Sequence, residues 1–153
     1  MRKAIFPGSF DPFHLGHLDI LNRALPLFDE VVLALGENST KKNLYPLNRR
    51  LNMLNTLFEN EVKVSVKSYS GLTARFCEQE NIKYILRGLR SGNDFDYEKS
   101  IAQLNNAISP NLDTVFFISP PQLSHVSSSI VREIMINDGD VQQFLPKIIA
   151  KMM

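Results

Sequence analysis

AIFPGSFDPFHLGHLDIL, residues 4–21, contains an expected strand, an expected helix and the loop that joins them. Ala4–Phe6 is a short apolar run stopped by a Pro-Gly pair, a pattern typical of a buried strand. Apolar residues then recur at helical spacing over residues 15–28. The loop between them and the first helical turn carry two histidines, His14 and His17, which a simple turn does not require.

Strand and helix patterns alternate along the rest of the chain. Apolar runs predict four further strands, at residues 31–35, 62–66, 84–86 and 115–118. Helical spacing predicts helices at residues 47–58, 72–79 and 127–137, and a last short helix after residue 146. Residues 87–96 are expected to form a loop, and a further helix follows it to about residue 108. Such alternation indicates right-handed crossovers and a parallel sheet. We therefore expect an α/β fold, a doubly wound parallel five-stranded sheet with helices on both faces, in one domain spanning residues 1–153.

The composition excludes several classes of protein. The 17 basic and 16 acidic side chains leave a formal charge of +1, without the basic face that bulk nucleic-acid binding needs. Cys77 is the only cysteine, which excludes an internal disulfide and a multi-cysteine zinc site. The N-terminal apolar run is too short for a signal peptide, and no stretch approaches the roughly 18 apolar residues of a membrane span. We expect a cytoplasmic protein with no nucleic-acid or membrane partner.

The segments that follow the expected strands are the ones to search for a site, because open α/β sheets bind ligands beyond the carboxyl ends of their strands. These segments are residues 7–17, 36–42, 87–92 and 119–129. In the first, His17 falls near the start of the expected helix, where backbone N–H groups and the helix dipole favour an anion. With the Ser9 hydroxyl it indicates a nucleotide-phosphate site. Two alternatives stay open: the histidines fill a turn, or His14, His17 and Asp11 bind a metal.

Cations follow two of the other strands. Lys41 and Lys42 come after residues 31–35, and a lysine ammonium can reach a phosphate, although the pair also suits a solvated loop. Arg87 and Arg90 come after residues 84–86, and a guanidinium can bind phosphate oxygens with two parallel hydrogen bonds. Glu98 on the next helix has three interpretations: it orients the arginines, accepts from a ribose or base, or is an ordinary surface charge.

Three consecutive serines, Ser127–Ser129, open the helix expected at residues 127–137. Serine is a good helix cap, but one cap needs one serine, so three indicate a second anion site. Arg132 follows, either as another cation of the site or as an exposed side chain. The sequence has no P-loop, no G-x-G-x-x-G motif and no convincing Ser–His–acid set. Cations, hydroxyls and helix N-termini together indicate phosphoryl or nucleotidyl transfer.

Three segments resemble known nucleotidyltransferases. PGSFDPFHLGH (residues 7–17) resembles the signature of those with an HxGH or TxGH motif, and SSSIVRE (residues 127–133) resembles their second signature. ILRGLRSGNDFDYEKSIAQLN (residues 85–105) resembles bacterial phosphopantetheine adenylyltransferases in particular, and the likeness covers nearly the whole chain. The resemblance implies a Rossmann-like fold and the penultimate step of coenzyme A synthesis. In that step ATP and 4'-phosphopantetheine give dephospho-coenzyme A and pyrophosphate with Mg²⁺. It also implies a homo-hexamer.

The resemblance also implies roles for individual residues. We expect His17 to donate to the α-phosphate in the transition state, Lys41 to steer the attacking phosphate, and Arg90 to hold the β- and γ-phosphates with Mg²⁺. The implied ATP contacts are Ser9, Phe10, His17, Gly88, Leu89, Arg90, Glu98, Leu123, Ser124, His125, Val126, Ser127, Ser128 and Ser129. The implied acceptor contacts are Ser9, Lys41, Thr73 and Arg87, and no protein ligand to a metal is expected.

Three positions depart from the family pattern. Ser9 stands where threonine is frequent, Leu123 where an aromatic residue is common, and His125 where the family has an apolar or aromatic one. None of these changes removes a charged or hydroxyl group from the expected phosphate site. Three rival functions stay open: a sister nucleotidyltransferase with another phosphorylated acceptor, a non-catalytic nucleotide sensor, and a zinc hydrolase.

Overall fold

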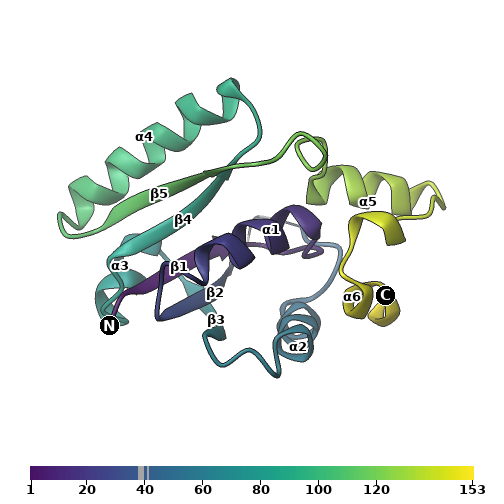
Figure 1. The fold of residues 1–153 in the computed structure, drawn as a ribbon, viewed down its shortest axis with the longest axis horizontal. Coiled ribbons are helices and arrows are strands. Elements are labelled where there is room, and N and C mark those ends of the chain that lie inside the picture. Colours follow the sequence, from purple (N-terminus) through teal and green to yellow (C-terminus); the bar gives the residue numbers. More distant parts are fainter. Residues whose placement is uncertain (38–39, 41) are drawn as a thin grey trace.

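Five parallel strands form the centre of the protein, in the order β3-β2-β1-β4-β5. A computed structural model describes residues 1–37, 40 and 42–153 (Figure 1). The strands are β1 (Lys3–Gly8), β2 (Glu30–Glu37), β3 (Val64–Ser70), β4 (Tyr84–Leu89) and β5 (Asp113–Ile118). The chain runs outward from β1 to β3 and then crosses back to β4 on the other side of β1. This reversal makes the carboxyl edge between β1 and β4 the place where a doubly wound sheet binds its ligand.

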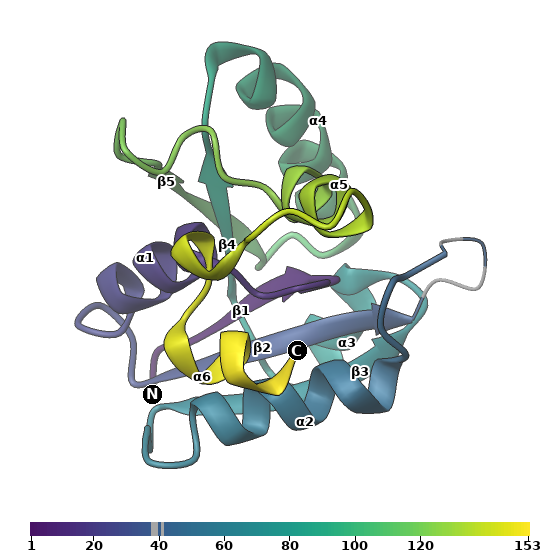
Figure 2. The same ribbon diagram turned by 90° about the vertical axis from the view of Figure 1, so that its right-hand side faces the viewer.

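Helices cover both faces of the sheet, as the alternation of patterns predicts (Figures 1 and 2). On one face lie α1 (Leu15–Ala24) and α2 (Leu47–Leu57), and on the other lie α3 (Thr73–Gln79) and α4 (Gly92–Ile108). The C-terminal part consists of α5 (Ser128–Ile136), a short 3-10 helix η1 (Gln142–Phe144) and α6 (Lys147–Met152). It packs against α2 through a third apolar cluster that includes Met53, Val131 and Ile149. The expected α/β architecture is confirmed.

Strands β1 and β2, in the middle of the sheet, are apolar on both faces, which explains their unbroken apolar runs. In β2, Leu33 and Leu35 pack toward α1 and α2, whereas Val32 and Ala34 pack toward α3. All four residues are fully buried. Burial on both sides fixes the register of the sheet, because a shift by one residue would exchange the two apolar sets. The carboxyl ends of β1 and β4 are thereby held at fixed positions.

The sequence predictions were wrong at several boundaries. Residues 87–96 were expected to be a loop, but β4 continues to Leu89 and α4 begins at Gly92. Ser91 caps α4 by accepting a hydrogen bond from the Asp94 N–H at 3.4 Å, so a glycine- and aspartate-rich segment starts a helix. The third strand begins at Val64, and Val62 is 97% exposed. No helix in the described part of the chain is long and apolar enough to cross a membrane.

Candidate functional site

Two adjoining cavities open at the carboxyl ends of the strands. The first has a volume of about 440 Å³ and lies between the ends of β1 and β4 and the start of α5. The second, of about 290 Å³, lies between the sheet, Thr73 at the start of α3, and α4. Ser9, Arg87 and Glu98 line both cavities and so form their common wall. Two ligands bound side by side would meet at this wall.

His14 and His17 form an unusual cap at the start of α1. His14 Nδ1 accepts a hydrogen bond from the Gly16 N–H, and His17 Nδ1 accepts one from the His14 N–H, each at 3.1 Å. The two rings stack with centroids 3.7 Å apart. A neutral imidazole that accepts through Nδ1 carries its proton on Nε2. Both histidines are therefore fixed in the tautomer with an Nε2–H donor, and both line the first cavity.

The electrostatic surroundings keep both rings neutral. Burial first, and the Arg90 guanidinium second, lower the pKa of His14 from 6.5 to about 4. Burial is also the main cause that lowers the pKa of His17 well below its usual value, followed by electrostatic interaction with His14 and with the guanidiniums of Arg87 and Arg90. His17 contacts the rings of Phe10 and Phe13 at centroid distances of 5.0 and 5.2 Å. At neutral pH, His17 is thus an oriented hydrogen-bond donor without a charge.

Gly16 allows the two rings to lie where they do. A Cβ atom at this position would lie 2.9 Å from His14 Cε1 and 3.0 Å from His14 Nδ1, closer than carbon side chains tolerate. Phe10, on the same loop, has a φ of 46°, and its ring packs on Phe6 and Phe13. The turn that the glycines and aromatics shape therefore presents the histidine rings to the first cavity.

Arg87 and Glu98 form a bidentate ion pair in the common wall. Arg87 Nε and Nη2 donate to the two Glu98 carboxylate oxygens at 2.7 and 2.5 Å, and Nη1 donates to the Pro7 carbonyl at 3.2 Å. The Glu98 side chain is 10% exposed and that of Arg87 is 31% exposed. Among the described residues, three of the five N–H donors of the guanidinium have partners, which leaves two for a ligand. The structure places Glu98 as the group that orients Arg87.

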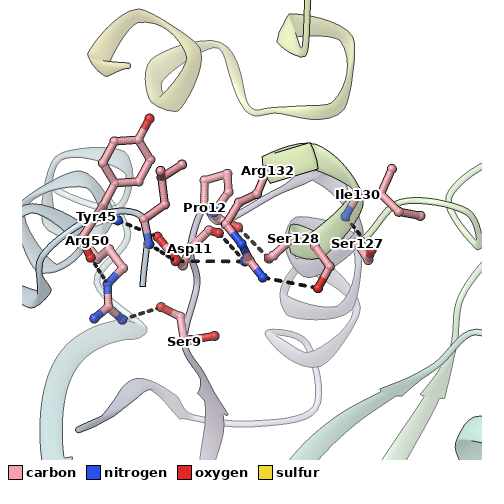
Figure 3. A network of polar contacts seen from close by, with 11 residues as sticks. Ser9, Asp11, Pro12, Tyr45, Arg50, Ser127, Ser128, Ile130 and Arg132 are labelled. Atoms are coloured by element: carbon pink, nitrogen blue, oxygen red, sulfur yellow. Dashed lines mark hydrogen bonds and ion pairs between the residues drawn. The ribbon is translucent and has the colours of Figure 1, made fainter. Parts of the chain in front are cut away.

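Two other cations face the first cavity. Arg90 is exposed, its backbone N–H donates to Asp94 at 2.9 Å, and its Nε lies 3.5 Å from the same carboxylate oxygen. Arg132 Nη1 donates to the Asp11 carbonyl at 2.6 Å, and Nη2 donates to Ser129 Oγ at 3.2 Å (Figure 3). The two guanidiniums supply positive charge on the wall where α4 and α5 begin.

The start of α5 is a candidate anion-binding element. Ser127 Oγ accepts from the Ile130 N–H at 3.2 Å, and Ser128 Oγ donates to the Pro12 carbonyl at 2.9 Å (Figure 3). An α-helix leaves its first N–H groups without intrahelical partners. At α1 the histidine cap uses two backbone N–H groups, whereas at α5 the first two helical residues, Ser128 and Ser129, line the first cavity. Of the two helix starts, α5 is thus the better placed to bind an anion.

Most of the residues expected to contact ATP lie around the first cavity. These are Ser9, Phe10, His17, Gly88, Arg90, Glu98, Leu123, Val126, Ser127, Ser128 and Ser129. Leu89, Ser124 and His125 are not in this lining: Ser124 Oγ donates to the Pro121 carbonyl, and the exposed His125 ring lies 6.3 Å from Phe144. Thr73 and Arg87 line the second cavity. Lys41 lies outside the residues that the structure describes, so its role stays a prediction.

The metal alternative does not fit the contacts of its three candidate ligands. The Asp11 carboxylate accepts from the Leu44 and Tyr45 N–H groups at 2.7 and 3.0 Å, and both histidines use Nδ1 for backbone N–H groups. Within residues 1–37, 40 and 42–153, no group of three or more His, Cys, Asp or Glu side chains is arranged to hold a metal ion.

The sequence alone did not identify the buried Arg50 or the role of Asp11. Arg50 is 4% exposed, and it donates to the Ser9 carbonyl at 2.7 Å and to the Tyr45 carbonyl at 2.9 Å. The Arg50–Ser9 contact joins residues 41 positions apart and the Asp11–Tyr45 contact joins residues 34 positions apart, so no local sequence pattern predicts either one. The one available signal was an arginine on the apolar helix at residues 47–58.

Comparisons with known proteins agree with this geometry. Residues 5–134 match the Cytidylyltransferase-like family. The chain is 48% identical over 151 residues to the phosphopantetheine adenylyltransferase of Christiangramia forsetii, covering 99% of both chains. It is 46% identical to that of Cytophaga hutchinsonii, over 95% of this chain and 97% of the relative, and 40% identical to that of Bacteroides thetaiotaomicron, over 96% and 97%. The chain belongs to the phosphopantetheine adenylyltransferase family, within the cytidylyltransferase-like group.

Proposed function

We propose that the protein transfers the adenylyl group of ATP to 4'-phosphopantetheine, giving dephospho-coenzyme A and pyrophosphate. Family membership supports the reaction. The observation that carries the proposal in this chain is the neutral Nε2–H donor of His17, placed in a cavity that also holds Arg90, Arg132 and the start of α5. These groups suit a triphosphate, and the adjoining second cavity leaves room for an acceptor.

The chemistry needs no nucleophile from the protein. An oxygen of the acceptor phosphate, already an anion at neutral pH, attacks the α-phosphorus of ATP. One P–O bond forms, the bond to the β-phosphate oxygen breaks, and pyrophosphate leaves with the electron pair. The protein must align the two phosphates and stabilise the charge that develops on the α-phosphate oxygens. We assign that stabilisation to the His17 Nε2–H, the β- and γ-phosphates to Arg90 and the α5 start, and the acceptor phosphate to Lys41 and Arg87.

The second cavity suits the uncharged arm of the acceptor. It is lined by apolar side chains from β4 and α4, Ile85, Ile101 and Ala102, and by polar groups at its ends. The Tyr69 and Thr73 hydroxyls form a 2.8 Å hydrogen bond, and both line the cavity. The charged side chains in its described lining, Arg87 and Glu98, are paired with each other. A flexible chain with amide groups fits such a surface better than a second polyphosphate would.

We propose that Mg²⁺ enters as part of the Mg–ATP substrate. Mg²⁺ keeps several waters and is commonly held by substrate phosphates and one or two carboxylates. The carboxylates nearest the first cavity, Asp94 and Glu98, are already paired with Arg90 and Arg87. The described residues thus offer no resident metal site, and the ion would share the charge of the triphosphate.

Pyrophosphate release is the decisive assay. The purified protein is incubated with Mg–ATP and, in turn, 4'-phosphopantetheine, nicotinamide mononucleotide and glycerol phosphate. We expect turnover with 4'-phosphopantetheine at least tenfold above the others, because the second cavity accommodates a long neutral arm. Turnover with another acceptor alone would favour a sister enzyme, and ATP binding without turnover would favour a nucleotide sensor.

We further propose that the protein is a cytoplasmic homo-hexamer. Large apolar side chains remain exposed on α4 and at the end of β5: Phe95 (42%), Tyr97 (67%), Leu104 (63%) and Ile118 (74%). Of the 17 residues of α4, Glu98 is the one that is buried, so this helix has apolar surface available for another copy. Sedimentation velocity on the full chain measures the mass, and a monomer at micromolar concentration would contradict the assembly.

A further inference from the structure

A buried carboxylate joins three segments of the chain next to the first cavity. Asp11 is 1% exposed, and its two carboxylate oxygens accept the N–H groups of Leu44 and Tyr45, just before α2. On its other side, Arg132 of α5 donates to the Asp11 carbonyl and lies 4.0 Å from the carboxylate. Figure 3 shows Asp11 between Tyr45 and Arg132. The loop after β1, the entry to α2 and the start of α5 are thus tied to one residue.

Arg50 completes the arrangement from α2. Its Nε donates to the Tyr45 carbonyl and its Nη1 donates to the Ser9 carbonyl (Figure 3). Tyr45 is thereby held through its N–H by Asp11 and through its carbonyl by Arg50. Burial lowers the pKa of Arg50, and the negative charge of Asp11 opposes that effect. The charges of Asp11 and Arg50 therefore stabilise each other.

Neither Asp11 nor Arg50 lines the first or the second cavity, but the groups that they hold do. Ser9 belongs to the wall common to both cavities, and Arg132 and Ser129 belong to the phosphate end of the first. An interaction that fixes both sides of a reaction site acts on alignment, and a misplacement of about 1 Å can cost roughly 10²-fold in rate.

We propose that Asp11 and Arg50 are positioning residues that hold the loop after β1 and Arg132 in register, so that two bound phosphates are aligned for transfer. This inference rests on the proposed function. Asp11 acts through Arg132 and the Leu44–Tyr45 backbone, and Arg50 acts through Ser9 and Tyr45. The cations that attract the nucleotide keep their charges when the contacts of Asp11 or Arg50 are lost. The rate of transfer therefore depends on Asp11 and Arg50 more than the affinity for the nucleotide does.

Two conservative variants test the proposal on the full chain. Asp11→Asn keeps the size of the side chain but replaces one accepting oxygen by a donor, and Arg50→Lys keeps the charge but cannot reach both carbonyls. Asp29→Asn is the control for the same substitution outside the site: Asp29 Oδ2 also accepts a backbone N–H, that of Arg2 at 2.6 Å, but at an exposed position before β2 and so at the opposite end of the sheet. For both test variants we expect kcat to fall by roughly 10²-fold and each KM to change less than about fivefold. The control should match wild type.

A second readout needs no turnover. Hydrogen exchange at the Leu44 and Tyr45 amides is measured with and without Mg–ATP, in wild type and in Asp11→Asn. Coupling through Asp11 predicts that ATP slows this exchange in wild type and not in the variant. A variant whose kcat per folded molecule is unchanged, or wild-type amides that do not respond to bound ATP, would overturn the proposal. Absence of wild-type turnover on 4'-phosphopantetheine would overturn the proposed function instead, and the exchange data would still decide the role of Asp11.

Discussion

Glu98→Ala would remove the partner that holds two nitrogens of Arg87, and the pair geometry sets the size of the effect. A hydrogen bond to a charged group is worth about 1.5–3 kcal/mol, and removing one partner of a fully buried pair costs about 3–5 kcal/mol. The Arg87 side chain is 31% exposed, so water in the cavities can solvate the released guanidinium. We therefore expect the free energy of unfolding to fall by about 1.5–3 kcal/mol, and the Tm by roughly 3–12 °C.

A double-mutant cycle measures the coupling directly. Urea unfolding is compared for wild type, Glu98→Ala, Arg87→Ala and the double variant. Arg87→Ala should cost more than Glu98→Ala, because it leaves the carboxylate of Glu98, whose side chain is 10% exposed, without its cation. The double variant should be more stable than the sum of the two changes predicts, with a coupling free energy of about 1.5–3 kcal/mol. In kinetic assays, Glu98→Ala should raise the KM for the acceptor more than that for ATP.

Two results would refute this reasoning. Stability changes that add to within about 0.5 kcal/mol would mean that the ion pair contributes no coupling. An increase confined to the KM for ATP would mean that Glu98 acts by contacting the nucleotide, the role that the family resemblance implies, and does not position Arg87.

Three further perturbations test other parts of the site. His17→Ala should fold and bind ATP but lose roughly 10²–10³-fold in kcat, as expected for one transition-state donor, and near-normal turnover would exclude that role. Between pH 6.5 and about 4 the unfolded chain binds a proton that folded His14 does not, so the free energy of unfolding should decrease by up to about 3 kcal/mol as pH falls. His14→Asn caps α1 without titrating and should reduce that dependence in urea unfolding from pH 7 to 4, leaving the part that the lowered pKa of His17 contributes, whereas an unchanged slope would assign it to other groups. Gly88→Ala places a Cβ 2.4 Å from Ile20 Cδ1 and should cost about 1–3 kcal/mol; adding Ile20→Val should recover part of it in thermal unfolding, and no recovery would locate the strain elsewhere.

The fold and the location of the site could be predicted because both depend on local patterns. The buried run at residues 31–35 appears as β2 with both faces packed, since only a central parallel strand needs apolar residues at every position. The rule that ligands bind beyond the carboxyl strand ends then selected the segments with His17, Arg90 and Ser127, which the structure brings to one cavity.

What the sequence did not predict depends on contacts between distant residues. Nothing near Asp11 indicates that its carboxylate binds the backbone of Tyr45, and a buried Arg50 looks like any polar position of an amphipathic helix. The start of α4 was missed for a different reason. Glycine and aspartate favour turns in isolation, but Ser91 caps the segment and Glu98 anchors it to Arg87, so tertiary contacts decide its conformation.

The cap at the start of α1 also has a consequence for chemical modification. Histidine reagents such as diethylpyrocarbonate add to the ring nitrogen that carries no proton. In both His14 and His17 that nitrogen is Nδ1, and it is occupied by a backbone N–H. Acylation therefore has to wait until the first turn of α1 opens, however accessible the rings are to solvent. The rate of carbethoxylation would report how often this helix end unwinds, and a bound triphosphate that holds the rings in place should slow it.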